Sequence, residues 1–541
     1  MTTRAASEAK LGGRAAWIAL ILVALTQAMS MVDRQILAIL VPRIKADLHV
    51  ADAEMGLLYG SVFALFYAIF SLPLGRLADG WVRTRLLSVS IIAWSVATGL
   101  AGFASSFGML ALSRLGVGVG EASVQPAGMS LLADSFPKRK RGMVMSWMAA
   151  AVALGLGGAL VLGGLTAGAW DEAWPQGGAP LGLKGWQAAF LVAAIPGLVL
   201  GLLLARLPEP KRGAADGHAP HRDLAPFKAA WRTLYAILPL GCWVNLARRG
   251  AGWASWAINL AGLAAIVAAG LALTAWNEAL RPNAPPLHLA GFTVTGAALQ
   301  WLITGFGCYV LLNWLQSLRL TDRPAFVLIA KSPAMLLVLA IGALQSVINY
   351  GVMGFTPTFL IQHFHQSQAS VALIFGTLSA AIGILGPLIA GPLSDWAHRM
   401  RPGGRLYVTL ASLTVSPFLG FVTYRAADIV GFYLWFVTYS IALTMWLPPI
   451  YATYLDLVLP RMRGTVISVY ILSMTIIGLG TGPYAVGLMS DVNGGDLGSA
   501  ILSLYWIGPL IVLLIVAAIR RLPKDEALLV GRASQAGESF A

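Results

Sequence analysis

Cysteine and charge are both scarce in this sequence. Its 541 residues include two cysteines, and only 11% of the residues are charged. Neither Cys242 nor Cys308 has metal-ligand spacing around it, so a disulfide framework or a metal centre is not expected. His363 and His365 form an isolated pair without cysteine or carboxylate partners, which is typical of surface residues. We therefore expect no metal and no cofactor.

Hydrophobic residues make up 58% of the chain, more than a soluble domain contains. A helix of about 20 apolar residues crosses the roughly 30 Å of hydrocarbon in a bilayer. Apolar runs of this kind occupy residues 15–41, 55–75, 86–106, 108–133, 143–168, 186–205, 254–276, 290–314, 333–361, 371–393, 406–424, 429–455, 465–489 and 499–519. The pattern predicts an all-α integral membrane protein with 14 spanning helices. Two six-helix bundles, 1–213 and 332–541, flank a linker, 214–331, that carries an interfacial segment and two additional spanning helices.

The basic residues indicate the topology. The net charge is +14, and most of the 37 Lys and Arg residues fall on one side if both termini are cytoplasmic, as the positive-inside rule requires. Residues 233–246 are too short to span comfortably and contain Pro239, so we expect them to lie in the interface. The prediction is a multi-pass protein of the inner membrane, functional as a monomer. Its basic charge then reflects contact with membrane lipids and not with nucleic acid.

Two short motifs occur twice in the chain. Gly75-Arg-Leu-Ala-Asp79 is followed by Arg83, and 316 positions later Gly391-Pro-Leu-Ser-Asp395 is followed by Arg399. A basic run that ends at Arg141-Gly142 is repeated 322 positions later at Arg463-Gly464. A membrane bundle built from two similar halves is the architecture of transporters that open alternately to the two sides.

The repeated residues are candidate gating residues. We expect Asp79 to face the positive N-terminus of the helix that begins near Gly464, and Asp395 that of the helix that begins near Gly142. Contacts of this kind would close the cytoplasmic side. The alternative is a pair of solvated loops whose basic residues anchor lipid headgroups. The complete set is Gly75, Asp79, Arg83, Arg141, Gly391, Asp395, Arg399 and Arg463.

Four charged residues fall well inside predicted helices of the first half: Asp33, Arg34, Arg114 and Glu121. A charge near the bilayer centre costs about 3 kcal/mol even on insertion scales, so these residues need partners or a function. Arg114 and Glu121 are seven positions apart and share one helix face. We predict that Asp33 and Glu121 take up and release protons while Arg34 and Arg114 pair with them or with an anionic substrate group. A purely structural cluster of ion pairs is the alternative.

The second half offers neutral candidates for a substrate cavity. Its helices carry Gln345, Asn349, Tyr350, Tyr439 and Trp446 at positions that can face inward. Such residues suit an amphipathic or aromatic substrate. Simple packing between helices is the alternative for each of them.

The motifs resemble those of the major facilitator superfamily: the loop at 75–85, its repeat at 391–399, and the glycine-rich run at 114–122. The runs Val32-Asp-Arg-Gln-Ile-Leu37, Gly120-Glu-Ala122 and Glu209-Pro-Lys-Arg-Gly213 further resemble the Spinster-like branch. The resemblance implies proton-linked movement of lipids or other amphipathic metabolites, with Asp33, Arg34, Arg114 and Glu121 at the coupling site. The loop departs from the usual pattern at Gly80, Val82 and Thr84.

Together these features predict a secondary active transporter and not an enzyme, because no nucleophile with its base occurs among the buried polar residues. The proton gradient is the expected energy source, and the expected substrate is amphipathic or lipid-like. The alternative is a proton symporter of a small organic or aromatic acid, whose carboxylate Arg34 or Arg114 would receive.

Overall fold

The computed structural model describes residues 11–137, 141–175, 178–212, 225–289, 292–459 and 462–538. Thirteen helical segments of this part of the chain are long and apolar enough to cross a membrane. The fourth predicted span, 108–133, is missing from that set because it is divided into helices of 15 and 12 residues. Counted as one crossing, this pair completes the predicted order of six, two and six spans.

The first half is helical from residue 14 to residue 205, with short breaks. Its helices are α1 (Arg14–Leu48), α2 (Asp52–Tyr59), α3 (Ser61–Gly80), α4 (Arg83–Ala101), α5 (Phe107–Glu121), α6 (Val124–Ser135), α7 (Arg141–Ala173) and α8 (Gly185–Ala205), with the 3-10 turn η2 (Pro180–Gly182) before α8. Gly60 separates α2 from α3, and a Cβ at this position would overlap the carbonyl oxygen of Leu479 in the second half. The break therefore occurs where the two halves touch.

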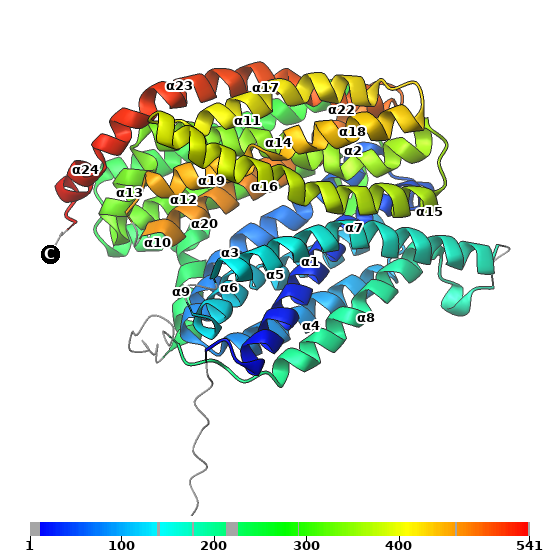
Figure 1. Cartoon of the computed structure of the whole chain (residues 1–541), viewed down its shortest axis with the longest axis horizontal. Coiled ribbons are helices and arrows are strands. Elements are labelled where there is room, and N and C mark those ends of the chain that lie inside the picture. The colour runs from blue at the N-terminus through cyan, green and yellow to red at the C-terminus, as the bar shows by residue number, and fades with distance from the viewer. Residues whose placement is uncertain are drawn as a thin grey trace, which may run out of the picture.

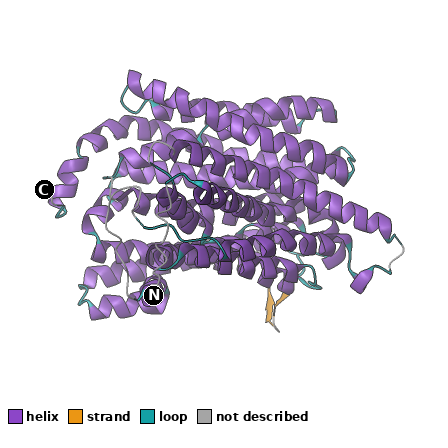
Figure 2. Cartoon of the chain, turned by 60° about the horizontal axis from the view of Figure 1, so that its bottom comes forward, coloured by secondary structure: helices purple, strands orange, loops and turns teal. Residues whose placement is uncertain are grey.

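The inserted segment adds two long helices and several short elements. It contains α9 (Pro226–Ile237), α10 (Pro239–Arg248), α11 (Trp253–Leu280), β1 (Leu287–Leu289), β2 (Phe292–Val294), α12 (Gly296–Thr321) and α13 (Arg323–Ala330). Pro239 begins α10 and separates it from α9, so neither helix is long enough to span. The strands pair in antiparallel register, with Leu287 opposite Val294, and project beyond the helices (Figure 2). This hairpin was not predicted, because three residues per strand are too few for an alternating pattern.

The second half repeats the six crossings with more interruptions. Its elements are α14 (Pro333–His363), α15 (Gln368–Ser370), η3 (Val371–Phe375), α16 (Gly376–Met400), α17 (Arg405–Tyr424), α18 (Ile429–Thr444), α19 (Leu447–Asp456), α20 (Arg463–Ser473), η5 (Met474–Leu479), α21 (Gly480–Val492), α22 (Leu497–Ser503), η6 (Leu504–Ile507), α23 (Gly508–Ala527) and α24 (Leu529–Gln535). Both η3 and η5 are π-helical, a local widening that is frequent at functional sites.

The two halves lie side by side, as Figure 1 shows with the first half in blue to cyan below the second half in yellow to red. We call the end of the bundle that carries Asp79 and Asp395 the motif end. The opposite end carries the loop between α1 and α2 and the β-hairpin. In α11 only 6% of the apolar window is buried, against 67% in α2–α3, so α11 lies at the periphery, where it can face lipid.

Candidate functional site

The centre of the site is an ion pair between Arg34 of α1 and Glu121 of α5. Arg34 Nε lies 2.6 Å from Glu121 Oε2, and Ser30 Oγ donates to the same oxygen at 2.8 Å. The Arg34 guanidinium also lies over the rings of Phe63 and Tyr67, 4.7 and 4.4 Å from their centroids. Glu121 is fully buried, whereas the Arg34 side chain is 19% exposed. The arginine is therefore the member of the pair that a ligand can reach.

Asp33 points to a different side of α1 from Arg34, as the turn of about 100° per residue requires. Its carboxylate accepts hydrogen bonds from Trp94 Nε1 at 3.0 Å and from Thr98 Oγ1 at 2.9 Å, both on α4. Asp33 is 1% exposed. Its surroundings are thus the interior of the first half, between α1 and α4, and it is not among the residues that border the cavity described below.

In this conformation Arg114 makes no hydrogen bond to a carboxylate of the described residues. Its Nη1 donates to the backbone carbonyl of Asp33 at 2.7 Å, and its Nη2 lies 3.4 Å from the carbonyl of Arg34. The guanidinium therefore spans the α1 backbone between the two acidic residues. Among the described residues, Arg114 Nε and Glu121 Oε1 have no hydrogen-bond partner although both atoms are buried. Such unsatisfied atoms are costly, and a rearrangement or a ligand that satisfies them is favoured.

A cavity of about 1090 Å³ lies between the two halves and reaches the motif end. Its walls come from Tyr67, Gly75 and Asp79 in the first half and from Tyr451, Gly464 and Ile471 in the second half. Tyr67 is also the ring that lies under the Arg34 guanidinium. The buried ion pair is thus separated from the cavity by one aromatic side chain.

None of the five neutral residues predicted for the second half is among the described residues that line this cavity. Tyr439 and Trp446 are buried, and Tyr439 is hydrogen-bonded to Tyr505. Gln345 is buried, whereas Asn349 and Tyr350 are half-buried. The second-half wall consists instead of residues such as Tyr451, Leu455, Ile467 and Ile471. The helix is interrupted between α18 and α19, where Pro448 and Pro449 follow Thr444, so a single helical period could not predict which residues of this segment face inward.

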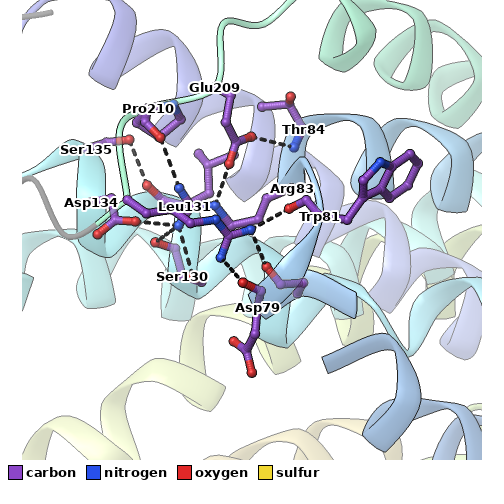
Figure 3. A network of polar contacts seen from close by, with 12 residues as sticks. Asp79, Trp81, Arg83, Thr84, Ser130, Leu131, Asp134, Ser135, Glu209 and Pro210 are labelled. Atoms are coloured by element: carbon purple, nitrogen blue, oxygen red, sulfur yellow. Dashed lines mark hydrogen bonds and ion pairs between the residues drawn. The ribbon is translucent and has the colours of Figure 1, made fainter. Parts of the chain in front are cut away.

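The loop motif of the first half forms a compact polar network (Figure 3). Arg83 is fully buried, and its guanidinium lies 2.7 Å from Glu209 Oε1 and 2.5 Å from Asp134 Oδ2. Arg212 donates to the carbonyl of Asp79 at 2.6 Å, which satisfies a free carbonyl at the end of α3. The network joins α4, α6 and the segment after α8. Arg83 therefore stabilises the first half, and none of these contacts crosses to the second half.

In the second half the counterpart of Arg83 is Arg405, and the alignment of Arg399 with Arg83 is corrected. Arg405 forms ion pairs with Asp456 and, at 3.3 Å, with Asp395, whereas Arg399 is exposed on α16. Arg405 and Asp456 lie 322 positions after Arg83 and Asp134, the interval of the second repeated motif. The error arose because the connection between the motif aspartate and the next helix is six residues longer in the second half.

The remaining gating residues show that the motif end is open. Asp79 and Gly464 border the same cavity, and a Cβ on Gly464 would meet no described atom within 4 Å. The predicted contact between Asp79 and the start of α20 is therefore not made in this conformation.

Gly391 is half-buried in α16, and Arg463 is exposed as the first residue of α20. Arg141 begins α7, and its side chain lies outside the described residues.

The opposite end is closed by a contact that the sequence did not predict. Asp491, near the end of α21, accepts hydrogen bonds from the backbone N–H groups of Asp52 at 3.0 Å and Ala53 at 2.9 Å. These groups begin α2, so a carboxylate of one half caps a helix N-terminus of the other. Arg281 of the inserted segment lies 3.2 Å from both Glu54 and Asp491. We call this end the sealed end.

Close backbone packing accompanies this contact. A Cβ on Gly56 would overlap the carbonyl oxygen of Pro483, and a Cβ on Gly487 would overlap that of Asp52. Both pairs cross the interface between the halves. Only glycine permits this separation, because any larger residue would place an atom where the opposing backbone lies.

A family model of the Major Facilitator Superfamily matches residues 23–483. The chain belongs to this superfamily. It is therefore a transporter and not an enzyme. Among its relatives is an MFS-type efflux pump of Mycolicibacterium smegmatis, 25% identical over 492 residues that cover 90% of this chain and 87% of that protein.

The resemblance to Spinster proteins is also confirmed. The sphingosine-1-phosphate transporter SPNS2 of Danio rerio is 31% identical over 191 residues, which cover 35% of each chain. A crystal structure of a bacterial homologue of the human lysosomal transporter Spinster, in an inward-facing and unoccupied conformation, superimposes with a TM-score of 0.64. That comparison covers 98% of this chain and 99% of the other at 22% identity, and it shows a shared fold.

Proposed function

We propose that this transporter carries an amphipathic or lipid-like anion across the inner membrane and couples its movement to protons at Glu121 and Asp33. The observation that carries the proposal is the Arg34–Glu121 ion pair, in which Glu121 is fully buried and Arg34 is partly exposed and lies beside Tyr67 of the cavity wall. With both termini in the cytoplasm, the motif end is the cytoplasmic end. The conformation described here is then inward-facing.

The chemistry follows from the competition for Arg34. When Glu121 takes up a proton it loses its charge, and the attraction that holds the guanidinium at 2.6 Å is largely removed. Arg34 is then available to an anionic group. Contacts with the rings of Phe63 and Tyr67 hold the guanidinium in either case, so it remains next to Tyr67, which borders the cavity.

The cavity favours a substrate with an apolar part. Its walls are rich in aliphatic and thioether side chains, among them Leu72, Met129, Met148, Ile467 and Ile471. Burial of an alkyl chain against such walls contributes about 0.8 kcal/mol for each methylene group. An anionic headgroup at Arg34 and an alkyl or aromatic part along these walls together describe an amphipathic anion.

Asp33 has a different place in the scheme. Its hydrogen bonds to Trp94 and Thr98 connect α1 to α4, and Arg114 holds the backbone between it and Arg34. Protonation of Asp33 would weaken a charge-assisted contact between these helices. We assign to it the proton that accompanies movement of α1 against α4.

Transport in proteoliposomes tests the assignment of Glu121. Wild-type protein is expected to take up a fluorescent lysophospholipid faster when a pH gradient is imposed, and Glu121→Gln is expected to abolish this stimulation while substrate exchange without a gradient persists. Glu172→Gln is the matched control, because Glu172 is exposed at the end of α7. Full stimulation in Glu121→Gln would overturn proton coupling at this residue.

The substrate class is tested separately. A panel of lysophospholipids and aromatic acids is offered to the wild type under the same gradient. Uptake of lysophospholipids supports the amphipathic substrate. Uptake of aromatic acids alone would overturn it in favour of an acid symporter, with Arg34 receiving the carboxylate.

A further inference from the structure

A second large cavity lies in the inserted segment, at the motif end of the molecule. It has a volume of about 740 Å³ and is formed by α9, α10 and the end of α12. Three arginines line it: Arg232, Arg248 and Arg249. Among the described residues that line it, none is acidic. Burial raises the pKa of Cys242, another lining residue, to about 11, so this thiol carries no negative charge at neutral pH.

The inner wall of this arginine pocket is held by a polar network. Asn259 Nδ2 donates to Asn313 Oδ1 at 2.9 Å and to Gln316 Oε1 at 2.7 Å, while Trp243 Nε1 donates to Asn259 Oδ1 at 2.8 Å. Asn313 in turn donates to the carbonyl of Ile237, the last residue of α9, at 3.1 Å. These bonds fix α9 and α10 against α11 and α12. The pocket is thus built before any ligand arrives, which lowers the ordering cost of binding.

The surroundings place the pocket at a membrane surface. Phe227, Trp231 and Leu240 of α9 and α10 are exposed by 57%, 64% and 71%. Exposed apolar residues on short helices that also carry arginines are typical of helices that lie in the headgroup region. Phe227 contacts Trp81 with ring centroids 5.0 Å apart, which ties α9 to the motif end. The arginines therefore lie at the level of the lipid headgroups.

The arginine pocket also adjoins the transport cavity. Thr233 and Trp314 border both cavities. Thr233 comes from α9 and Trp314 from α12, so the inserted segment supplies the wall between the two spaces. A molecule in the arginine pocket would contact the same two side chains as a molecule in the transport cavity.

We propose that the arginine pocket binds the anionic headgroup of a phospholipid from the adjoining leaflet. Guanidinium groups recognise phosphate through paired charge-assisted hydrogen bonds, and basic pockets between helices at a membrane surface suit such headgroups. The exposed Trp231 and Leu240 would contact the acyl chains. The bound lipid then supports the wall formed by Thr233 and Trp314. This site is independent of the identity of the transported substrate.

Lipid binding to the full-length protein tests the proposal without any transport measurement. Purified protein is titrated with phosphatidylglycerol and with phosphatidylcholine, and bound lipid is counted by native mass spectrometry. The wild type is expected to retain one phosphatidylglycerol in preference to phosphatidylcholine. Arg232→Gln combined with Arg248→Gln is expected to weaken this binding roughly 30-fold, since each arginine near a membrane surface contributes about a factor of five.

Controls separate the site from general charge effects. Arg249 is kept, because its Nη1 donates to the carbonyl of Leu320 and its loss could disturb the fold. Arg319 lies near the end of α12, over the ring of Phe326, and does not line the pocket. The Arg319→Gln variant should therefore bind phosphatidylglycerol as the wild type does. Equal binding of the two lipids to the wild type, or equal losses in Arg319→Gln and in the double variant, would overturn the proposal. If the double variant unfolds, each single variant is measured in its place, and unchanged preference in both overturns it as well.

Discussion

The two halves of the bundle contact each other differently at its two ends. At the sealed end, glycine lets backbones touch, and Asp491 of the second half caps α2 of the first half. At the motif end, Asp79 and Gly464 border a cavity of about 1090 Å³ between the halves. Each end thus carries a carboxylate and a helix N-terminus from opposite halves, but only one end has them in contact. The state of the transporter can be described by which of these contacts is made.

The largest effect is expected from Gly56→Val at the sealed end. The new Cβ would overlap the carbonyl of Pro483, so the halves must separate there, and the population of the sealed state should fall more than tenfold, a change of about 1.4 kcal/mol or more. Spin labels at Glu172 and Asn493, exposed at this end in opposite halves, would report the separation by double electron–electron resonance.

Gly158→Val is the control for that substitution. It carries the same helix penalty, but its Cβ meets no described atom within 4 Å. Its distance distribution should match that of the wild type. An unchanged distribution in Gly56→Val would show that glycine is not required at the sealed end.

Asp491→Asn should weaken the same end by a smaller amount. The amide keeps an acceptor for the start of α2 but loses the negative charge that faces the helix N-terminus and Arg281. We expect the population of the sealed state to fall about fivefold, which corresponds to a free-energy change of about 1 kcal/mol. The same spin labels measure it. Asp496→Ala, which removes the N-cap of α22 within the second half alone, should lower stability without moving the labels apart.

The two copies of the loop motif can be compared through Arg405 and Arg399. Arg405→Gln removes the ion pairs with Asp456 and Asp395, and we expect the Tm to fall by about 2–4 °C. Arg399→Gln changes an exposed side chain and should alter the Tm by less than about 1 °C. Thermal unfolding in detergent measures the Tm of both variants. Equal shifts would mean that Arg405 is not the counterpart of Arg83.

The smallest effect is expected from Asp79→Asn. Its carboxylate is exposed in the open motif end, so the Tm should not change. Closure of the motif end should become about two- to fivefold less favourable if Asp79 caps α20 in the closed state. Labels at Arg206 and Met400, exposed at this end in opposite halves, would report closure when a substrate is added. Identical closure in the variant and the wild type would exclude Asp79 from the gate.

Much of the architecture could be predicted because it depends on properties that are local in sequence. Apolar runs set the spans, and the isolated charges Arg34 and Glu121 identified a buried pair that the structure forms. The helix period also separated Asp33 from Arg34 correctly. The breaks were harder to predict, since the division at Gly60 depends on a backbone from the other half.

The residues that the sequence did not reveal depend on contacts between distant segments. Asp491 follows an apolar run like many loop aspartates, and only its position beside Asp52 gives it a role. Arg405 was missed because a longer connection shifted the repeat. Its interval of 322 from Arg83 equals that of Arg141 and Arg463, so this signal was present in the sequence.

The inserted segment reaches the sealed end as well as the motif end. Arg281, at the end of α11, joins Glu54 of the first half to Asp491 of the second, and Thr295, at the start of α12, donates to Glu278. The β-hairpin connects these two helices and extends past the bundle (Figure 2). A nanobody raised against the hairpin would therefore bind next to the contacts that close the sealed end. Such a reagent could arrest the transport cycle without entering the substrate path.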